Sequence, residues 1–209
     1  MKSKDGKLLL ILVVILSLFG LIMIYSASSI WANYKFNDPF KFVKAQGLFF
    51  LLGIFLIFFI KKIDPNKFYN YSNVILLVSF ILLILVLIPG IGTVRNGSRS
   101  WFKVGPFGIQ PSEFAKIGLI IYVSKYLKNN QRNLKNIIKG VFPLLFVIGI
   151  FFLLILLEPD FGTGMVLVLS LVGIIFISGV KTSFFLKIGL IGLIMIAGLI
   201  IVAPYRMAR

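Results

Sequence analysis

Carboxylates are scarce in this chain and are the groups in it best suited to acid–base chemistry. The sequence holds 6 Asp and Glu residues against 22 Lys and Arg, and it has no Cys and no His. Thiol nucleophiles, imidazole bases, disulfides and zinc sites are therefore excluded for these 209 residues. Glu113, Glu158 and Asp160 fall where an apolar segment meets a loop. A charge at membrane depth is costly unless it is paired or hydrated, so these three are candidate functional groups.

Each of these carboxylates also has a structural interpretation. Glu113 and Lys116 are three residues apart, so they lie on one helical face and can form an ion pair that fixes helix packing. Residues 158–160 are expected to open a tight turn that Gly162 and Gly164 complete, and the aspartate of this turn could simply cap the next helix. From the residues alone, the functional and the structural interpretations both stay open.

The segment 96–113 has the most unusual composition in the chain. Glycines and prolines are expected to break it into turns, and within or beside it lie three cations and three aromatic residues: Arg95, Arg99, Lys103, Trp101, Phe102 and Phe107. Arginine beside aromatic rings suits a segment that lies on the membrane and receives an anionic headgroup, although an aromatic belt with snorkelling cations has the same composition. Ser112 is expected to cap the helix that follows, and a helix N-terminus favours phosphate.

These groups belong to a chain that is mostly apolar. It is 59% hydrophobic and 13% charged, with a mean hydropathy of +1.05, whereas a soluble domain carries about 25% charged residues. The formal net charge is +16, but the basic residues lie in short clusters between apolar runs, so no nucleic-acid partner is expected. The long apolar runs lack the alternation of barrel strands and predict an integral membrane protein of the all-α class.

Seven apolar segments are candidates for membrane-spanning helices, which need about 17 to 25 residues each. We expect them at residues 8–25, 42–60, 74–88, 113–126, 141–157, 163–180 and 184–203. No linker or low-complexity tract divides them, so residues 1–209 are expected to form a single helical membrane domain. Lys and Arg are more frequent in the loops that face the cytoplasm if the N-terminus lies inside, and this favours that orientation.

Four motifs resemble signatures of the SEDS family, which comprises FtsW, RodA and SpoVE. They are YSAS at 25–28, NGSRSW at 96–101, QPSEFAK at 110–116 and EPDFGTG at 158–164, and their order and spacing resemble the family over the whole chain. The resemblance implies about ten spans and a large outer loop after the seventh, which holds the aspartate proposed as catalytic. The chain reaches only the start of that loop, so it resembles the N-terminal part of a longer protein. Residues 203–209 slightly favour FtsW or SpoVE over RodA.

One departure from the family pattern lies in the second span. Family members usually carry a basic residue directly before the glutamine of this span. Here Gln46 follows Ala45, and Lys44 lies one position earlier, about 100° around the helix.

The resemblance implies a peptidoglycan glycosyltransferase that works in cell division or cell-shape maintenance. Its substrate would be lipid II, an undecaprenyl-pyrophosphate-linked disaccharide peptide, polymerised at the outer face of the bacterial cytoplasmic membrane. Such a reaction needs a base for a sugar hydroxyl and cations at the departing pyrophosphate, and carboxylates with Lys and Arg meet both needs. The principal base is expected beyond residue 209, so these residues alone are not expected to be active.

By the same resemblance, Glu113 and Asp160 are expected to support catalysis, with Asp160 orienting the acceptor or holding a divalent cation. Arg99 and Lys103 would contact the pyrophosphate, and Trp101 the sugar or the lipid. The residues expected to bind substrate are Arg99, Trp101, Lys103, Gln110, Ser112, Lys116 and Glu158.

Two other functions remain open from the sequence. Charged residues within the spans could line the path of a lipid II flippase. The chain could also be a non-catalytic scaffold of the division or elongation machinery. In this family the implied partner is a class B penicillin-binding protein, a single-span transpeptidase.

Overall fold

The computed structural model describes residues 4–95, 97–105, 107–134, 136–187 and 189–190. They belong to two compact units, residues 1–67 and residues 68–209. Helices dominate both units, as the apolar runs predict. Most of the expected span at 184–203 lies outside the described residues.

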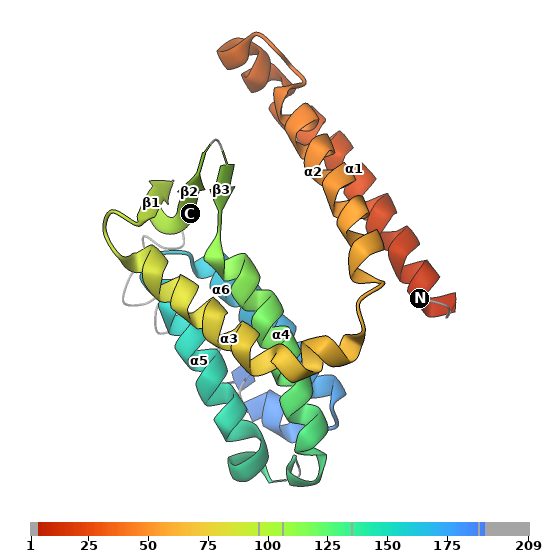
Figure 1. Ribbon diagram of the computed structural model, residues 1–209, viewed down its shortest axis with the longest axis vertical. Coiled ribbons are helices and arrows are strands. Elements are labelled where there is room, and N and C mark those ends of the chain that lie inside the picture. The colour runs from red at the N-terminus through yellow and green to blue at the C-terminus, as the bar shows by residue number, and fades with distance from the viewer. Residues whose placement is uncertain (1–3, 96, 106, 135, 188, 191–209) are drawn as a thin grey trace. The chain divides into compact units, whose positions relative to one another are not determined.

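The first unit is a pair of long helices, α1 (Lys4–Phe36) and α2 (Lys41–Ile60), joined by a short turn (Figure 1). Asp38 holds this turn, since its carboxylate accepts a hydrogen bond from the Phe40 N–H at 3.0 Å and pairs with the Lys44 ammonium at 2.9 Å. The first helix is longer than the expected span of 8–25 because it continues through the YSAS motif to Phe36.

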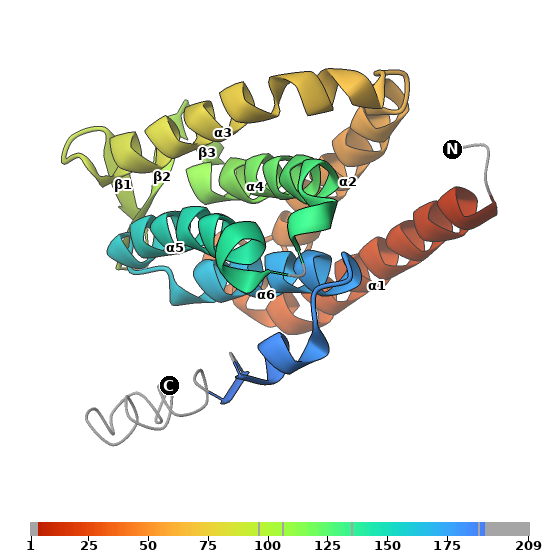
Figure 2. The same ribbon diagram turned by 90° about the horizontal axis from the view of Figure 1, so that it is seen from below.

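The second unit is built on four helices that run alongside one another (Figures 1 and 2). They are α3 (Pro65–Leu87), α4 (Pro111–Asn129), α5 (Phe142–Leu157) and α6 (Phe161–Ile177). A short 3-10 turn, Gln131–Asn133, and a π-helical turn, Ile137–Val141, connect α4 to α5. Among the described residues, α1, α2, α3 and the stretch Ile137–Leu157 are long and apolar enough to cross a membrane, and α6 is a shorter apolar helix.

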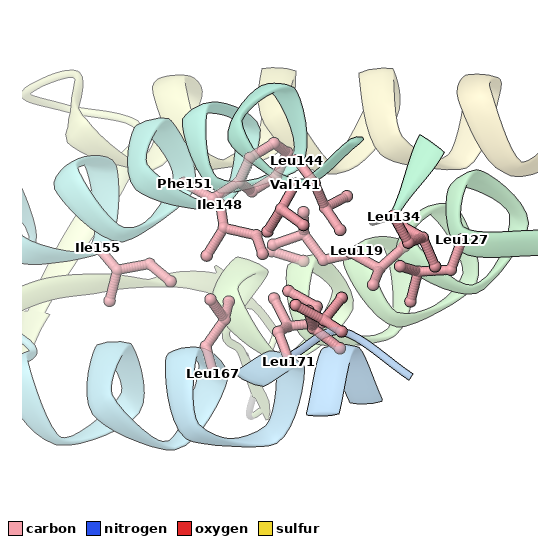
Figure 3. Packing of buried hydrophobic residues seen from close by; sticks show 14 of the residues in the cluster. Leu119, Leu127, Leu134, Val141, Leu144, Ile148, Phe151, Ile155, Leu167 and Leu171 are labelled. Carbon is pink, nitrogen blue, oxygen red and sulfur yellow. The ribbon is translucent and has the colours of Figure 1, made fainter. Parts of the chain in front are cut away.

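Apolar stripes with a spacing of three or four residues form the core of the second unit (Figure 3). Each stripe is the buried face of one helix, and the three faces meet between α4, α5 and α6. On these three helices the members with the lowest exposure are Ala115, Leu119, Val123, Leu144, Ile155, Leu167, Leu171 and Ile175.

Helix α3 packs closely on α4 because one residue at the contact lacks a side chain. A Cβ atom on Gly118 would lie 2.7 Å from the Ser79 Oγ, which donates a hydrogen bond to the Ile75 carbonyl at 2.8 Å. The glycine therefore sets the distance between the two helices at this point.

Along the chain, a three-stranded antiparallel sheet connects the end of α3 to the start of α4, where turns alone were expected (Figure 1). Its strands are β1 (Gly92–Arg95), β2 (Ser98–Val104) and β3 (Phe107–Ile109), in the order β1-β2-β3. Gly97 (φ 83°) and Gly105 (φ 59°) have the left-handed backbone that the tight turns require. The glycines thus mark the turns of a sheet, and the residues between them are extended.

Two helix starts differ from the sequence expectation. Pro111 takes the first position of α4, so Gln110 is the N-cap residue and Ser112 lies inside the helix without capping it. Helix α6 begins at Phe161, which places Gly162 and Gly164 in its first turn and not in the preceding loop.

Candidate functional site

Asp160 is the polar centre of the junction between α5 and α6. Its Oδ1 accepts the Thr163 N–H at 3.1 Å, which caps α6 as the structural interpretation predicts. Its Oδ2 accepts hydrogen bonds from the Thr163 hydroxyl and from the Gln110 amide, both at 2.8 Å. One carboxylate therefore caps α6 and joins it to the residue that starts α4.

The hairpin of β1 and β2 is attached to the same junction. The Ser98 hydroxyl donates a hydrogen bond to the backbone carbonyl of Glu158 and lies 2.9 Å from the Ser100 hydroxyl. Ser100 is 1% exposed, so this serine pair faces the interior. The contacts of Ser98 and Gln110 bring the NGSRSW, QPSEFAK and EPDFGTG motifs together at one corner of the second unit.

Glu158 is buried at this corner. Its side chain is 0% exposed, and neither carboxylate oxygen has a hydrogen-bond partner among the described residues. Burial, followed by the charge of Asp160, raises the pKa of Glu158 to about 8. The carboxyl therefore holds its proton at neutral pH, and its burial makes it a structural group of the corner.

A β-bulge interrupts the alternation of side chains along β2. The ladder pairs Arg99 with Val94 and Trp101 with Thr93, so Ser100 is the extra residue between them and simple alternation does not hold. Arg99 lies beside Gly92, the partner of Phe102, because a Cβ atom on that glycine would be 3.0 Å from the arginine Cγ. Trp101 and Lys103 lie beyond the bulge and share the other face.

Further contacts fix two arginines of this hairpin. Arg99 donates a hydrogen bond to the Leu87 carbonyl, at the C-terminal end of α3, over 3.4 Å. The guanidinium of Arg95 lies 5.0 Å from the centre of the Trp101 ring. Neither Arg95 nor Ser98 was among the expected site residues; the dipeptide Asn96-Gly97, a signal for a tight hairpin, could have indicated both.

Glu113 and Lys116 form the expected ion pair, with 2.8 Å between Oε1 and Nζ. The Glu113 side chain is 55% exposed and that of Lys116 is 23% exposed, so the pair is accessible. Ser112 is fully buried, and its hydroxyl has no hydrogen-bond partner in the described part of the chain. Burial argues against a direct contact between Ser112 and substrate.

Acidic residues at the corner do not form a metal-binding cluster. Within the described residues no group of three or more His, Cys, Asp and Glu side chains is placed to hold an ion. Both oxygens of Asp160 are already engaged by protein donors.

The motifs that meet at this corner also identify the chain's relatives. The profile of the FtsW/RodA/SpoVE family, described as cell cycle protein, matches residues 7–209. The chain belongs to this family. It is 45% identical over 208 residues to stage V sporulation protein E of Bacillus subtilis, and the match covers 100% of this chain and 57% of that protein. It is 35% identical to a probable peptidoglycan glycosyltransferase FtsW of Geobacter sp. strain M18, with 100% and 58% covered.

Solved structures share the fold. The rod shape determining protein RodA of Thermus thermophilus has 27% identity and a TM-score of 0.64, over 86% of this chain and 58% of that one. A chain from the structure described as "Structural coordination of polymerization and crosslinking by a peptidoglycan synthase complex" has 25% identity and a TM-score of 0.62, over 92% and 55%. The expected class, a helical polytopic membrane protein, is confirmed. The chain spans less than two thirds of the length of each of these proteins.

Proposed function

We propose that this chain carries part of the site of a peptidoglycan glycosyltransferase that polymerises lipid II. The observation that supports this most is the meeting of three family motifs at one corner through the Gln110–Asp160 and Ser98–Glu158 contacts. Relatives named as probable peptidoglycan glycosyltransferases support the reaction class.

In this reaction a sugar hydroxyl of the acceptor attacks the anomeric carbon of the donor. The bond from that carbon to the pyrophosphate oxygen breaks, and the hydroxyl proton passes to a base. Arg99 and Lys103, the two cations of β2, suit the developing negative charge on the pyrophosphate. Trp101, held against Arg95, offers a flat apolar surface to a sugar or a lipid chain.

Two of the three candidate carboxylates hold other parts of the site in position, and one can contact substrate. We assign Asp160 and Glu158 to positioning, because Asp160 is saturated by protein donors and Glu158 is buried. Glu113 is exposed and keeps one oxygen outside its pair with Lys116, so it is the described carboxylate best placed to meet substrate. The principal base would come from beyond residue 209.

The site would face the outside of the bacterial cytoplasmic membrane, with the N-terminus in the cytoplasm. The distribution of Lys and Arg among the loops supports this orientation. A class B penicillin-binding protein is the proposed partner, and the likeness to a chain of a peptidoglycan synthase complex supports a partner of this kind.

The test is polymerisation by the full-length protein, purified in detergent with its transpeptidase partner and given labelled lipid II. We expect glycan chains from the native protein and about 100-fold less from Arg99→Gln, the usual scale for losing one group that stabilises developing charge. The double variant Lys61→Gln/Lys62→Gln, at the C-terminal end of α2 in a loop expected on the cytoplasmic side, is the control and should keep its activity.

Two outcomes would contradict the proposal. Absence of polymer in detergent together with lipid II transfer across sealed vesicles would indicate the flippase. Undiminished glycan synthesis by both Arg99→Gln and Glu113→Gln would leave this chain a scaffold, whereas loss of glycan with intact partner binding would support catalysis.

A further inference from the structure

The helix pair of the first unit borders an open groove, lined mostly by apolar side chains, that the proposed glycosyltransferase site does not use. One pocket of about 450 Å³ lies between α1 and α2, and a second of about 260 Å³ shares Ile24, Gln46 and Phe49 with it. Together they form what we call the α1–α2 groove. Its lining runs along α1 from Ser17 to Trp31, or about 21 Å at the helical rise.

Helical spacing explains why a space remains between the two helices. On α1 the lining residues of the larger pocket are 24, 27, 28 and 31, and on α2 they are 42, 45, 46 and 49, so each set is one helical face. Ala27, Ser28 and Ala45 are small and leave room between these faces. Trp31 and Phe42 stack with 5.6 Å between ring centres and close the groove toward the turn.

Two ammonium groups lie at the closed end of the groove. The Nζ of Lys35 is 4.8 Å from the centre of the Trp31 ring, and the Nζ of Lys41 is 4.2 Å from that of Phe36. The Phe36 ring in turn contacts both Trp31 and Phe42, with 5.9 Å between centres in each case. The nearby acid, Asp38, pairs with a third lysine, so this end of the groove keeps a net positive charge.

An amide side chain lies part-way down the groove. The other polar side chains of the lining, Ser17 and Ser28, donate their hydroxyl protons to carbonyls of their own helix. Gln46 lines both pockets and follows Lys41 by five residues, about 7.5 Å along α2. A hydrocarbon chain alone gives an amide at this depth nothing to bind, whereas an ester carbonyl gives its N–H groups an acceptor.

We propose that the α1–α2 groove binds a glycerophospholipid with an anionic headgroup. One acyl chain lies in the groove, an ester carbonyl accepts a hydrogen bond from Gln46, and the phosphate lies near Lys35 and Lys41. One leaflet of the hydrocarbon core is about 15 Å thick, so a 21 Å groove holds a chain of that length with room for the glycerol. A polyprenyl pyrophosphate has no ester carbonyl and a chain much longer than one leaflet, so it fits less well.

The test is native mass spectrometry of the purified full-length protein, delipidated and then titrated with phosphatidylglycerol. We expect one tightly retained lipid. Lys35→Gln/Lys41→Gln should weaken its binding about 30-fold, since each lysine near an anionic lipid surface contributes about one kcal/mol. Lys61→Gln/Lys62→Gln is the matched control, because these two lysines also lie over phenylalanine rings but outside the groove lining. This variant should bind phosphatidylglycerol as tightly as the native protein does.

Further variants test whether the acyl chain occupies the groove and whether Gln46 contacts the ester carbonyl. Ala27→Leu fills the groove and should abolish retention. Gly53→Val also adds three carbon atoms to one of these helices, at a position where the added Cβ atom meets nothing within 4 Å, and should keep retention. Gln46→Leu should weaken binding of phosphatidylglycerol about fivefold and leave binding of its ether-linked analogue unchanged.

The proposal is overturned if Ala27→Leu retains the lipid as well as the native protein does. It is equally overturned if undecaprenyl phosphate displaces phosphatidylglycerol at equal or lower concentration, because the groove would then serve a polyprenyl chain. Since neither measurement involves glycan synthesis, failure here is distinct from failure of the proposed glycosyltransferase.

Discussion

The hydrogen bond between Gln110 and Asp160 can be tested by exchanging the chemical groups at its two ends. Asp160→Ala removes the N-cap of α6, at about 1 kcal/mol, and the acceptor of two side-chain hydrogen bonds. Hydrogen bonds to a charged acceptor contribute about 1.5–3 kcal/mol each. These are only partly buried, so we use the lower value and expect a total loss of about 4 kcal/mol. Asp160→Asn keeps one oxygen for the Thr163 N–H and should cost about half as much.

The informative variant is the double exchange Asp160→Asn/Gln110→Glu. Alone, Gln110→Glu sets two carboxylates about 2.8 Å apart. Asp160→Asn removes the charge, and the Gln110 amide can flip to accept a hydrogen bond from the new amide. Together they restore one donor and one acceptor with the direction of donation reversed. The Thr163 hydroxyl can rotate to accept, so no group need lose its partner. We therefore expect the double variant to be about 2 kcal/mol more stable than the sum of the single effects.

Unfolding by sodium dodecyl sulfate in mixed micelles measures these differences. Residues 1–209 hold two tryptophans, so a Trp31→Phe background leaves Trp101, in the hairpin beside the corner, as the tryptophan reporter of this part of the chain. Glu113→Gln is the control, since a surface ion pair contributes about 0–1 kcal/mol. If the double variant is only as stable as the two single effects predict by addition, Gln110 and Asp160 do not interact in the membrane-embedded protein and the described corner is wrong.

Two further predictions use the same unfolding assay. The pKa of Glu158 is raised from 4.5 to about 8 in the folded chain, so the folded state holds the proton more tightly than the unfolded state does. We expect the free energy of unfolding to fall as the pH rises from about 4.5 through about 8. If the same pH dependence survives in Glu158→Gln, Glu158 is not the group that titrates. Gly118→Ala should lower the free energy of unfolding by about 1–3 kcal/mol, because its Cβ would lie 2.7 Å from the Ser79 Oγ. Adding Ser79→Ala should recover most of this loss. Strictly additive losses would rule out the contact.

The helices were predictable from sequence because their apolar runs are long, but their ends were not. The expected span at 8–25 is part of a helix that reaches Phe36, since polar residues beyond the hydrocarbon region can continue a helix as well as end it. At α4 the proline moved the start: with Pro111 in the first helical position, the cap falls on Gln110 and not on Ser112. Ends of helices are decided by single residues, which a hydropathy pattern does not weigh.

The site was only partly predictable, because its contacts join residues far apart in the chain. Asp160 as a cap and the Glu113–Lys116 pair follow from local spacing, and the structure confirms both. Gln110 lies 50 residues from Asp160, and Ser98 lies 60 residues from Glu158. No periodicity reports such pairs, so the burial of Glu158 and the attachment of the hairpin required the structure.

The bulged strand β2 explains how one short segment is attached at several points. The ladder pairs Arg99 with Val94 and Trp101 with Thr93, so Ser100 is the extra residue of the bulge. Ser98 contacts the Glu158 carbonyl and Arg99 reaches the Leu87 carbonyl, whereas Trp101 lies against the Arg95 guanidinium. The expectation of simple turns had no means of assigning these contacts. The sheet is therefore the element that fixes neighbouring serines and cations to different partners.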